Sequence, residues 1–283
     1  MAVRKFTEEN LTREVISRLD GTPNPRLKKV MGSLVRHLHA FVREVRPTQE
    51  EWFAGIEFLT RTGHMCDDKR QEFILVSDTL GVSMLVDFIN HGGPGKATKS
   101  TVLGPFYTED PPERALGASI AKDGTPGEPC VVSGTVKDLK GKAVANAVID
   151  VWEAAGDGFY DVQKPDGTNL RARFRPDALG RFHFRCVKPV SYPVPHDGPV
   201  GRMLVATGRH PMRPGHLHFM IEAPGFDKLV THLFVKGDKY LASDAVFGVK
   251  DSLIVDFRKN PAGGFQCRYD FVLKPKATRS RKK

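Results

Sequence analysis

The stretch Ala147-Val148-Ile149-Asp150-Val151-Trp152 decides the fold class of this chain. Its β-branched and aromatic residues favour an extended strand, in which Val148, Asp150 and Trp152 alternate onto one face. Similar short stretches recur through the C-terminal two thirds, between turns rich in Gly and Pro. We predict further strands over residues 130–136, 181–186, 202–206, 216–221, 229–235 and 268–273. Many short strands joined by such turns indicate a β-sandwich.

The first hundred residues follow a helical pattern instead. Asn24 followed by Pro25 is typical of a helix start, and an apolar stripe with steps of three and four follows it. The stripe consists of Leu27, Met31, Leu34, Leu38, Phe41, Val42 and Val45. Thr48 and Glu51 have the spacing of a capping box for the next helix. Further helical stretches are expected from Thr7 toward Leu19 and over about 67–90.

This change of pattern predicts an α+β chain with two main regions. We expect a helical domain over residues 1–99, a linker at about 91–105 and a β-sandwich catalytic domain over residues 100–273. Residues 274–283 form a basic tail that we expect to be disordered.

Charge and composition narrow the class of function. The 283 residues carry a formal net charge of +10, but the last ten hold six Lys or Arg and no acid. The remainder carries 37 basic against 33 acidic residues, or +4, which argues against nucleic acid as a partner. No apolar run approaches the roughly 20 residues of a membrane span, and residues 1–18 are too charged for a secretory signal. We therefore predict a cytoplasmic protein.

Cysteine spacing removes two further classes of protein. The four cysteines lie far apart, without a CxxC pair, at Cys66, Cys130, Cys186 and Cys267. This spacing argues against a structural zinc ribbon and against a disulfide framework. We expect reduced and mostly buried thiols.

The strongest chemical signal is Arg213-Pro214-Gly215-His216-Leu217-His218-Phe219. Two histidines separated by one residue on a strand point to the same face, so both imidazoles can reach one metal ion. Such pairs also occur without a metal, and this one needs further ligands. His232, the aspartates of the loop 157–161 and several glutamates qualify by composition alone.

Two tyrosines stand in positions that suggest a different metal. Tyr160 follows the 147–152 strand in a turn, and Tyr192 lies in a loop stiffened by prolines. A lone Tyr is ordinarily a half-buried packing residue. Because a free phenol has a pKa of about 10, it ligates at neutral pH only when a strong Lewis acid displaces its proton. Two Tyr with two His would suit ferric iron rather than zinc, and the residues alone leave both open.

Three segments in order resemble the intradiol ring-cleavage dioxygenases. They are Asp157-Gly158-Phe159-Tyr160, Tyr192-Pro193-Val194-Pro195 and Arg213-Pro214-Gly215-His216-Leu217-His218-Phe219. The stretches Asp78-Thr79-Leu80-Gly81-Val82-Ser83 and Thr101-Val102-Leu103-Gly104-Pro105-Phe106-Tyr107 also fit the family. The resemblance covers nearly the whole chain except the basic tail.

The resemblance implies a fold, a cofactor and roles for residues. It implies a transthyretin-like β-sandwich catalytic domain and an N-terminal helical domain that forms a homodimer, with a possible phospholipid at the dimer interface. It also implies a mononuclear non-haem Fe(III) held by Tyr160, Tyr192, His216 and His218. Arg213 would stabilise negative charge on the substrate, and Tyr192 would accept a proton as an aromatic diol binds. The diol and O2 would then react.

Within the family, the segments 229–234 and 243–250 resemble members that act on hydroxyquinol. Catechol-cleaving members tend to carry Gln in place of His232 and Glu in place of Leu103. The product would be 3-hydroxy-cis,cis-muconate or its tautomer maleylacetate, and Asp78 would accept a hydrogen bond from the extra hydroxyl. The expected substrate pocket is Phe73, Leu75, Asp78, Val102, Leu103, Gly104, Pro105, Phe106 and Val246. Catechol or chlorocatechol cleavage, a zinc hydrolase and a transthyretin-like binding module without chemistry are the alternatives.

Overall fold

The computed structural model describes residues 6–68, 70–92, 95–165 and 167–276. Its described helices are α1 (Leu11–Ser17), α2 (Pro25–Val45), α3 (Gln49–His64), α4 (Glu72–Thr79), α5 (Val82–His91) and α6 (Pro199–Ala206), with short 3-10 turns η1 (Asp161–Gln163) and η2 (Asp251–Leu253). No helix in these ranges is long and apolar enough to cross a membrane. All four cysteines are free, and all but Cys66 are buried, as predicted.

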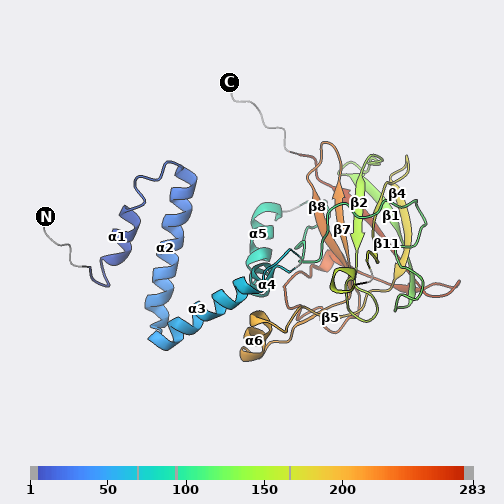
Figure 1. Ribbon diagram of the computed structural model, residues 1–283. Coiled ribbons are helices and arrows are strands. Elements are labelled where there is room, and N and C mark those ends of the chain that lie inside the picture. The colour runs from blue at the N-terminus through green and yellow to red at the C-terminus, as the bar shows by residue number, and fades with distance from the viewer. Residues whose placement is uncertain (1–5, 69, 93–94, 166, 277–283) are drawn as a thin grey trace, which may run out of the picture. The chain divides into compact units, whose positions relative to one another are not determined.

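The strands form two main sheets and one short pair. They are β1 (Pro129–Asp138), β2 (Val148–Trp152), β3 (Arg171–Phe174), β4 (Arg181–Val187), β5 (Tyr192–Pro193), β6 (Met212–Arg213), β7 (His216–Glu222), β8 (Leu229–Val235), β9 (Ile254–Val255), β10 (Arg258–Lys259) and β11 (Phe265–Leu273). One sheet has the order β3-β2-β7-β8-β9 and the other β10-β11-β1-β4 (Figure 1). β5 pairs with β6 separately.

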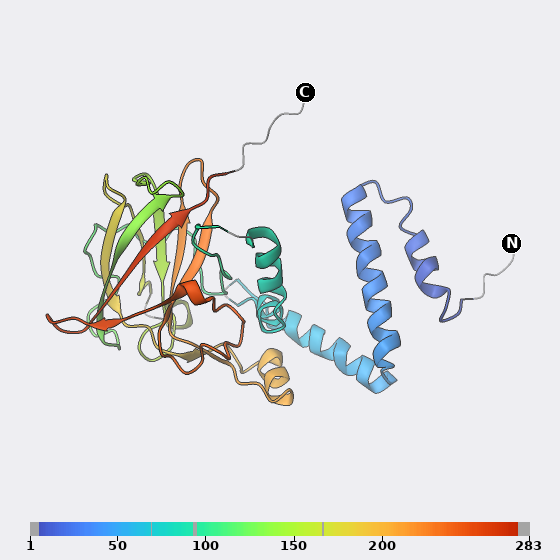
Figure 2. The same ribbon diagram turned by 180° about the vertical axis from the view of Figure 1, so that it is seen from behind.

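The two sheets enclose a core of aromatic and aliphatic side chains. Phe182 and Phe184 on β4 and Phe271 on β11 pack against Phe174 and Phe219 of the other sheet, with ring centroids 4.8–6.3 Å apart. Figure 2 shows the long strand β11 crossing beside β1 in one of the layers. The predicted β-sandwich with N-terminal helices is therefore confirmed.

The five-stranded sheet is buried on both faces, and each face has its own task. Ile149, Val151, Leu217 and Phe219 point into the core between the sheets. Because successive side chains alternate, the residues between them point to the opposite face. That face carries Asp150, Trp152, His216 and His218, all of them buried. One strand pattern thus supplies both the core and a polar, buried surface.

The start signals read from the sequence are confirmed. The Asn24 side chain accepts hydrogen bonds from the backbone N–H of Arg26 and Leu27, at 2.9 and 3.0 Å. The Thr48 hydroxyl accepts from the N–H of Glu51 at 3.2 Å, and the Glu51 carboxylate accepts from the N–H of Thr48 at 2.8 Å. These caps depend only on neighbours in sequence.

Two predictions of secondary structure are wrong. Residues 202–206, expected as a strand, belong to α6, whose first turn is stabilised by the buried Glu72 carboxylate accepting from the N–H of Val200 at 3.2 Å. The expected helical stretch 67–90 is two helices, α4 and α5, separated at Gly81. Gly81 has a φ of 75°, which ends one helix and re-aims the next.

The chain divides into two compact units, residues 1–60 and 61–283. In the first, α1 and α2 are joined by a 2.9 Å hydrogen bond between Thr12 and His39 and by Arg43, which donates to the Thr12 hydroxyl at 2.7 Å. In the second, α4 to α6 belong with the β-sandwich. The boundaries 1–99, 91–105 and 100–273 stay predictions. Most of the predicted tail, 277–283, lies outside the described residues.

Candidate metal and substrate site

Four donor atoms meet on the polar face of the five-stranded sheet. The hydroxyl oxygens of Tyr160 and Tyr192 are 2.9 Å apart, and the Nε2 atoms of His216 and His218 are 3.1 Å apart. The Tyr160 oxygen lies 2.8 Å from His218 Nε2, and the Tyr192 oxygen lies 3.2 Å from His216 Nε2. These distances close a ring of about 3 Å edges. Ligands about 2 Å from one shared ion have this spacing.

Each of the four side chains comes to this point for a local reason. His216 and His218 lie on the same face of β7. Tyr192 lies on β5, which pairs directly with Arg213 on β6. Tyr160 follows a turn in which Gly158 has a φ of 83°, and a Cβ there would lie 3.1 Å from the Tyr192 side chain. A side chain at residue 158 would therefore crowd Tyr192.

The two histidines are held in their neutral form. Burial, with the Arg213 charge beside it, lowers the pKa of His216 well below its usual range. Burial, followed by the charges of His216 and Arg213, does the same to the pKa of His218. Nδ1 of His216 lies 2.7 Å from the carbonyl of Pro214. A proton on Nδ1 leaves the Nε2 lone pair free for a metal.

The two tyrosines differ in how easily they ionise. Burial raises the pKa of Tyr160 well above its usual range, and the neighbouring Tyr192 raises it further. Burial also raises the pKa of Tyr192, but the adjacent Arg213 charge opposes that rise. Both phenols are therefore neutral at pH 7 until a Lewis acid binds them.

Aromatic rings and an ion pair hold Tyr160 and His218 in place. The Phe106 ring stacks on Tyr160 with centroids 4.5 Å apart, and Trp152 stacks on His218 at 4.7 Å. The carboxylate of Asp161, next to Tyr160 in sequence, is paired with Arg171, and both side chains are almost fully buried. The turn that carries Tyr160 is thus anchored to β3.

A third histidine completes a row across the sheet. Trp152 of β2, His218 of β7 and His232 of β8 are direct partners in the strand register. The His232 ring is fully buried, and its centroid lies 4.1 Å from that of His218. Metal-binding atoms of His216, His218 and His232 all lie within 4.8 Å of one another. His232, which the sequence allows as a further metal ligand, therefore also lies close to the other two histidines.

Arg213 lies close to two of these histidines, with its Nη2 atom 3.5 Å from His232 Nδ1. Its Nη1 lies 3.0 Å from His216 Nε2, and its Nε donates to Asp244 at 3.0 Å. The side chain is buried, so the guanidinium charge is shielded from bulk water. A fixed positive charge at this position favours negative charge near the four donor atoms.

The predicted pocket residues fall into two groups. Leu75, Val102 and Val246 belong to one buried apolar cluster, and Phe106 packs with the tyrosines. Leu103 and Phe73 are 40% and 46% exposed. Three of the predicted residues, Leu75, Pro105 and Phe106, line a mainly apolar hollow of about 460 Å³, and Leu103, Gly104 and Pro105 line an adjoining one of about 720 Å³. The other predicted pocket residues line neither of these two hollows: Phe73, Asp78, Val102 and Val246.

Asp78 is the charged member of the predicted pocket. Its side chain is 3% exposed, and burial raises its pKa, although a hydrogen bond from Ser83 and the charge of Arg213 act against the rise. A buried carboxyl group that interacts with Arg213 can accept a hydrogen bond from a polar ligand.

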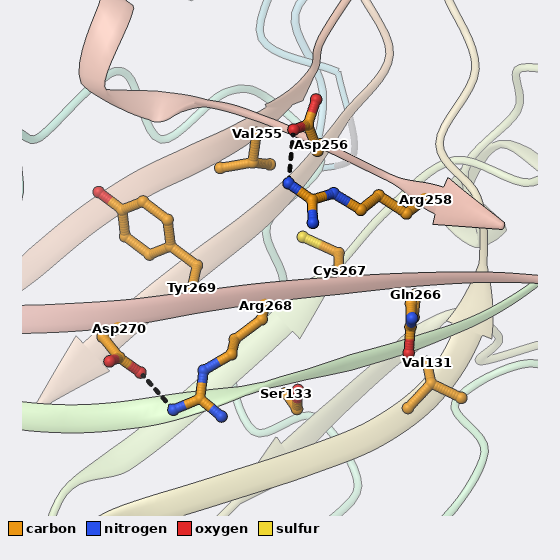
Figure 3. Close-up of a pocket in the computed structure, with 10 residues that line it drawn as sticks. All are labelled: Val131, Ser133, Val255, Asp256, Arg258, Gln266, Cys267, Arg268, Tyr269 and Asp270. Atoms are coloured by element: carbon orange, nitrogen blue, oxygen red, sulfur yellow. Dashed lines mark hydrogen bonds and ion pairs between the residues drawn. The ribbon is translucent and has the colours of Figure 1, made fainter. Parts of the chain in front are cut away.

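A separate hollow of about 680 Å³ lies at the other sheet, along β11 and residues 255–258 (Figure 3). Its arginines are already paired: Arg258 with Asp256 at 3.2 Å and Arg268 with Asp270 at 3.7 Å. None of the predicted site residues, all of which the structure describes, lines it. The donor atoms and the chemistry lie elsewhere.

The sequence interpretation missed residues that support the site. Asp244 pairs with Arg213, Trp152 stacks on His218, and Arg171 pairs with Asp161 next to Tyr160. In the sequence, Asp244 belongs to the segment 243–250 and carries no signal of its own. It lies 31 residues from Arg213 along the chain, so the sequence does not show their contact. Trp152 carried a usable signal, because it shares the alternating face of β2 with Asp150.

Comparison with known families covers most of the chain. Residues 102–275 match the family model described as dioxygenase. Residues 24–98 match the model described as catechol dioxygenase N terminus. Together they account for well over half of the chain, in the order in which the helical and β regions occur.

Curated relatives and solved structures agree with these matches. The chain is 54% identical to 6-chlorohydroxyquinol 1,2-dioxygenase of Cupriavidus pinatubonensis, covering 96% of this chain and 99% of that protein. It is 50% identical to hydroxyquinol 1,2-dioxygenase of Nocardioides simplex, covering 97% and 98%. The crystal structure of hydroxyquinol 1,2-dioxygenase from Pseudomonas putida DLL-E4 matches with a TM-score of 0.89 at 50% identity, covering 95% and 99%.

Proposed function

The chain belongs to the intradiol ring-cleavage dioxygenases, and from that premise we propose that it uses one ferric ion to cleave hydroxyquinol with O2. Cleavage between two adjacent hydroxyls would give 3-hydroxy-cis,cis-muconate or its tautomer maleylacetate. One observation carries the proposal: two phenol oxygens and two imidazole nitrogens lie in a ring with edges of 2.8–3.2 Å.

The donor set fits ferric iron. Phenolate oxygen is a hard ligand, and displacing the protons of two buried phenols needs a strongly charged Lewis acid. Tyr160 and Tyr192 would supply two negative charges, and His216 and His218 two neutral nitrogens. Ferric iron bound there would supply Lewis acidity, which draws electron density from the chelated diol and activates it toward O2.

We assign different tasks to the two tyrosines. Tyr160 is fully buried beneath Phe106, so it would hold the metal throughout, as would His216 and His218. Tyr192 directly precedes Pro193, which lines the 460 Å³ hollow. Phe159, which directly precedes Tyr160, lines the same hollow, so it is by analogy with the family that we assign to Tyr192 the uptake of a proton as the diol binds.

Arg213 would act on the ring rather than on the metal. The ring gains negative charge as it loses its aromatic character, and a buried guanidinium already aimed at this point stabilises that charge without reorganising. Its Nη1 lies 3.0 Å from His216 Nε2, close to where the substrate oxygens would bind.

Hydroxyquinol is favoured over catechol by the pocket and by the relatives. The Asp78 carboxyl is buried where it interacts with the charge of Arg213, and it could accept a hydrogen bond from the third hydroxyl, which catechol lacks. Relatives of 50–54% identity act on hydroxyquinol or 6-chlorohydroxyquinol. A buried acceptor left without a partner costs about 1–3 kcal/mol, so catechol should be cleaved about 10- to 100-fold less efficiently.

O2 uptake by iron-loaded protein tests the function. We expect one O2 consumed per hydroxyquinol, above the rate of autoxidation without enzyme, and slower uptake with catechol. Assays with 6-chlorohydroxyquinol define tolerance at the ring. Preference for catechol would contradict the proposed substrate. Zinc at full occupancy in the purified protein, or no O2 uptake with any diol, would contradict the proposed ring cleavage.

The His232→Gln variant tests which residue sets substrate preference. His232 is buried against both histidine ligands, so a smaller amide should shift the ratio of kcat/KM for hydroxyquinol to that for catechol by about tenfold toward catechol. Lys228→Gln is a matched control. Lys228 is exposed and directly precedes β8, so this variant should leave the ratio unchanged. An unaltered ratio in the His232 variant would remove this residue from the specificity argument.

We also propose that residues 1–99 form a dimerisation domain. The predicted apolar stripe of α2 is largely exposed, and its exposed members include Leu34, Leu38 and Phe41. Exposed apolar stripes of this size mark interaction surfaces. A second copy of the chain, with a phospholipid at the interface, would bury it.

The Phe41→Glu variant tests the dimer. The side chain is 59% exposed, and a charge at the centre of an apolar interface should weaken association by at least about 100-fold. Arg36→Glu, on the charged side of the same helix, should leave the mass of the dimer in solution unchanged. Light scattering and lipid extraction should find a lipid-containing dimer in the wild type. A monomeric wild type would contradict the proposal.

A further inference from the structure

The carboxylate of Asp244 accepts four hydrogen bonds, although the proposed reaction gives this residue no role so far. Its carboxylate accepts from Arg213 Nε at 3.0 Å and from Arg213 Nη2 at 3.4 Å. It also accepts from the backbone N–H of Val246 at 3.4 Å and of Gly248 at 2.9 Å. The Asp244 side chain is 2% exposed. One buried carboxylate therefore joins Arg213 to the segment 244–248.

These contacts fix the orientation of the guanidinium. A fork-shaped group held by Nε and one Nη cannot rotate about its long side chain. The remaining terminal nitrogen, Arg213 Nη1, is left 3.0 Å from His216 Nε2. Without Asp244, a buried Arg213 would lose the carboxylate with which it pairs, and its position near the donor atoms would no longer be determined.

The same carboxylate also holds the segment that carries Val246. Val246 belongs to the buried cluster that contains Leu75 and Val102. A Cβ at Gly248 would lie 3.0 Å from Thr101 Oγ1, 3.1 Å from Arg213 Nη2 and 3.3 Å from the Asp244 carboxylate. The segment 244–248 thus fits closely around the ion pair, and a shift of either partner would shift the segment.

We propose that Asp244 is a positioning residue for ring cleavage, which sets the place of Arg213 and of Val246 together. This inference rests on the proposed dioxygenase function and adds a residue to it. Asp244 does not touch the metal ligands or the substrate in this account. It acts through Arg213, so its removal should lower kcat more than it weakens substrate binding.

A purely structural role makes a different prediction, and Arg209 supplies the control. Arg209 donates to the carbonyl of Thr79 at 2.7 Å and to the carbonyl of Ala245 at 3.1 Å. It therefore secures the same segment, 244–248, to the end of α4 without contacting Arg213. Loosening of the segment alone should appear equally in Arg209→Gln and in Asp244→Asn.

The experiment compares iron-loaded wild type, Asp244→Asn and Arg209→Gln. O2 uptake gives kcat and KM for hydroxyquinol, anaerobic spectral titration gives the affinity for the diol, and visible absorption reports the phenolate-to-iron charge transfer. We expect Asp244→Asn to keep its iron, colour and diol affinity within about threefold while kcat falls about 100-fold, since a displacement of about 1 Å can have that effect. Arg209→Gln should change kcat by less than about threefold.

Gly248→Ala is a second route to the same answer if Asp244→Asn does not fold. The added methyl should separate Arg213 from Asp244 without removing a charge, and kcat should again fall at least tenfold with iron retained. Asp244→Glu should recover part of the lost kcat. Unchanged kcat in Asp244→Asn, or equal losses in Asp244→Asn and Arg209→Gln, would overturn the inference. Failure of the wild type to consume O2 would instead overturn the proposed function.

Discussion

Replacing Tyr160 by Phe should abolish ring cleavage and remove the iron or its colour. Tyr160 contributes the donor atom that lies 2.9 Å from the Tyr192 oxygen and 2.8 Å from His218 Nε2. Loss of a partner outside the ligand set can already cost about 10- to 100-fold in metal affinity. Loss of a ligand should cost more than 100-fold. Metal analysis and visible absorption of protein reconstituted with ferric iron measure both effects.

Tyr107→Phe is the matched control for this variant. Tyr107 packs on Trp152 in the same aromatic group, with centroids 5.1 Å apart, and its hydroxyl is 3.5 Å from the Asp150 carboxylate. It lies outside the ring of donor atoms, so its removal should leave iron and colour unchanged. Chelation of the wild type should bleach the protein reversibly. Full iron content with an unaltered spectrum in Tyr160→Phe would exclude Tyr160 as a ligand.

The second large effect should come from Arg213→Ala, which we expect to keep its iron and lose about 100- to 1000-fold in kcat. That range is typical when one preorganised group that stabilises developing charge is removed. The variant should also be less stable by about 3–5 kcal/mol, because the buried Asp244 carboxylate loses its partner. Stopped-flow O2 uptake and denaturant unfolding measure the two effects separately.

The double variant Arg213→Ala/Asp244→Asn separates stability from catalysis. It removes both charges of the buried pair, so much of the lost stability should return. Activity should not return, since no cation remains beside the donor atoms. If the double variant regained activity, or Arg213→Ala were fully active, Arg213 would have no role in the reaction.

Local signals predicted the fold where a structure depends on neighbouring residues. The Asn24 cap and the Thr48–Glu51 capping box involve partners at most three residues away, so the sequence shows them directly. The alternation in β2 and β7 also survives, because both faces of that sheet are buried and the register fixes every side chain.

Prediction failed where a distant partner decides the local structure. The segment 202–206 is apolar enough to pass for a strand, but the Glu72 carboxylate, 128 residues away, stabilises the N-terminus of α6. Gly81 allowed a bend between α4 and α5, and only its φ of 75° shows that the chain uses it. Short apolar runs remain ambiguous between helix and strand for this reason.

The sequence by itself determined the two regions of the chain, the histidine pair on one strand face and the family to which the chain is similar. Tertiary structure alone brought Tyr160 and Tyr192 within 3.2 Å of His218 and His216, and Asp244 within 3.0 Å of Arg213. Strand alternation is a property of adjacent residues. The contacts between these tyrosines and histidines join residues that are 24 to 58 positions apart in the chain. They depend on how the two sheets pack, and this packing is determined by residues throughout the core.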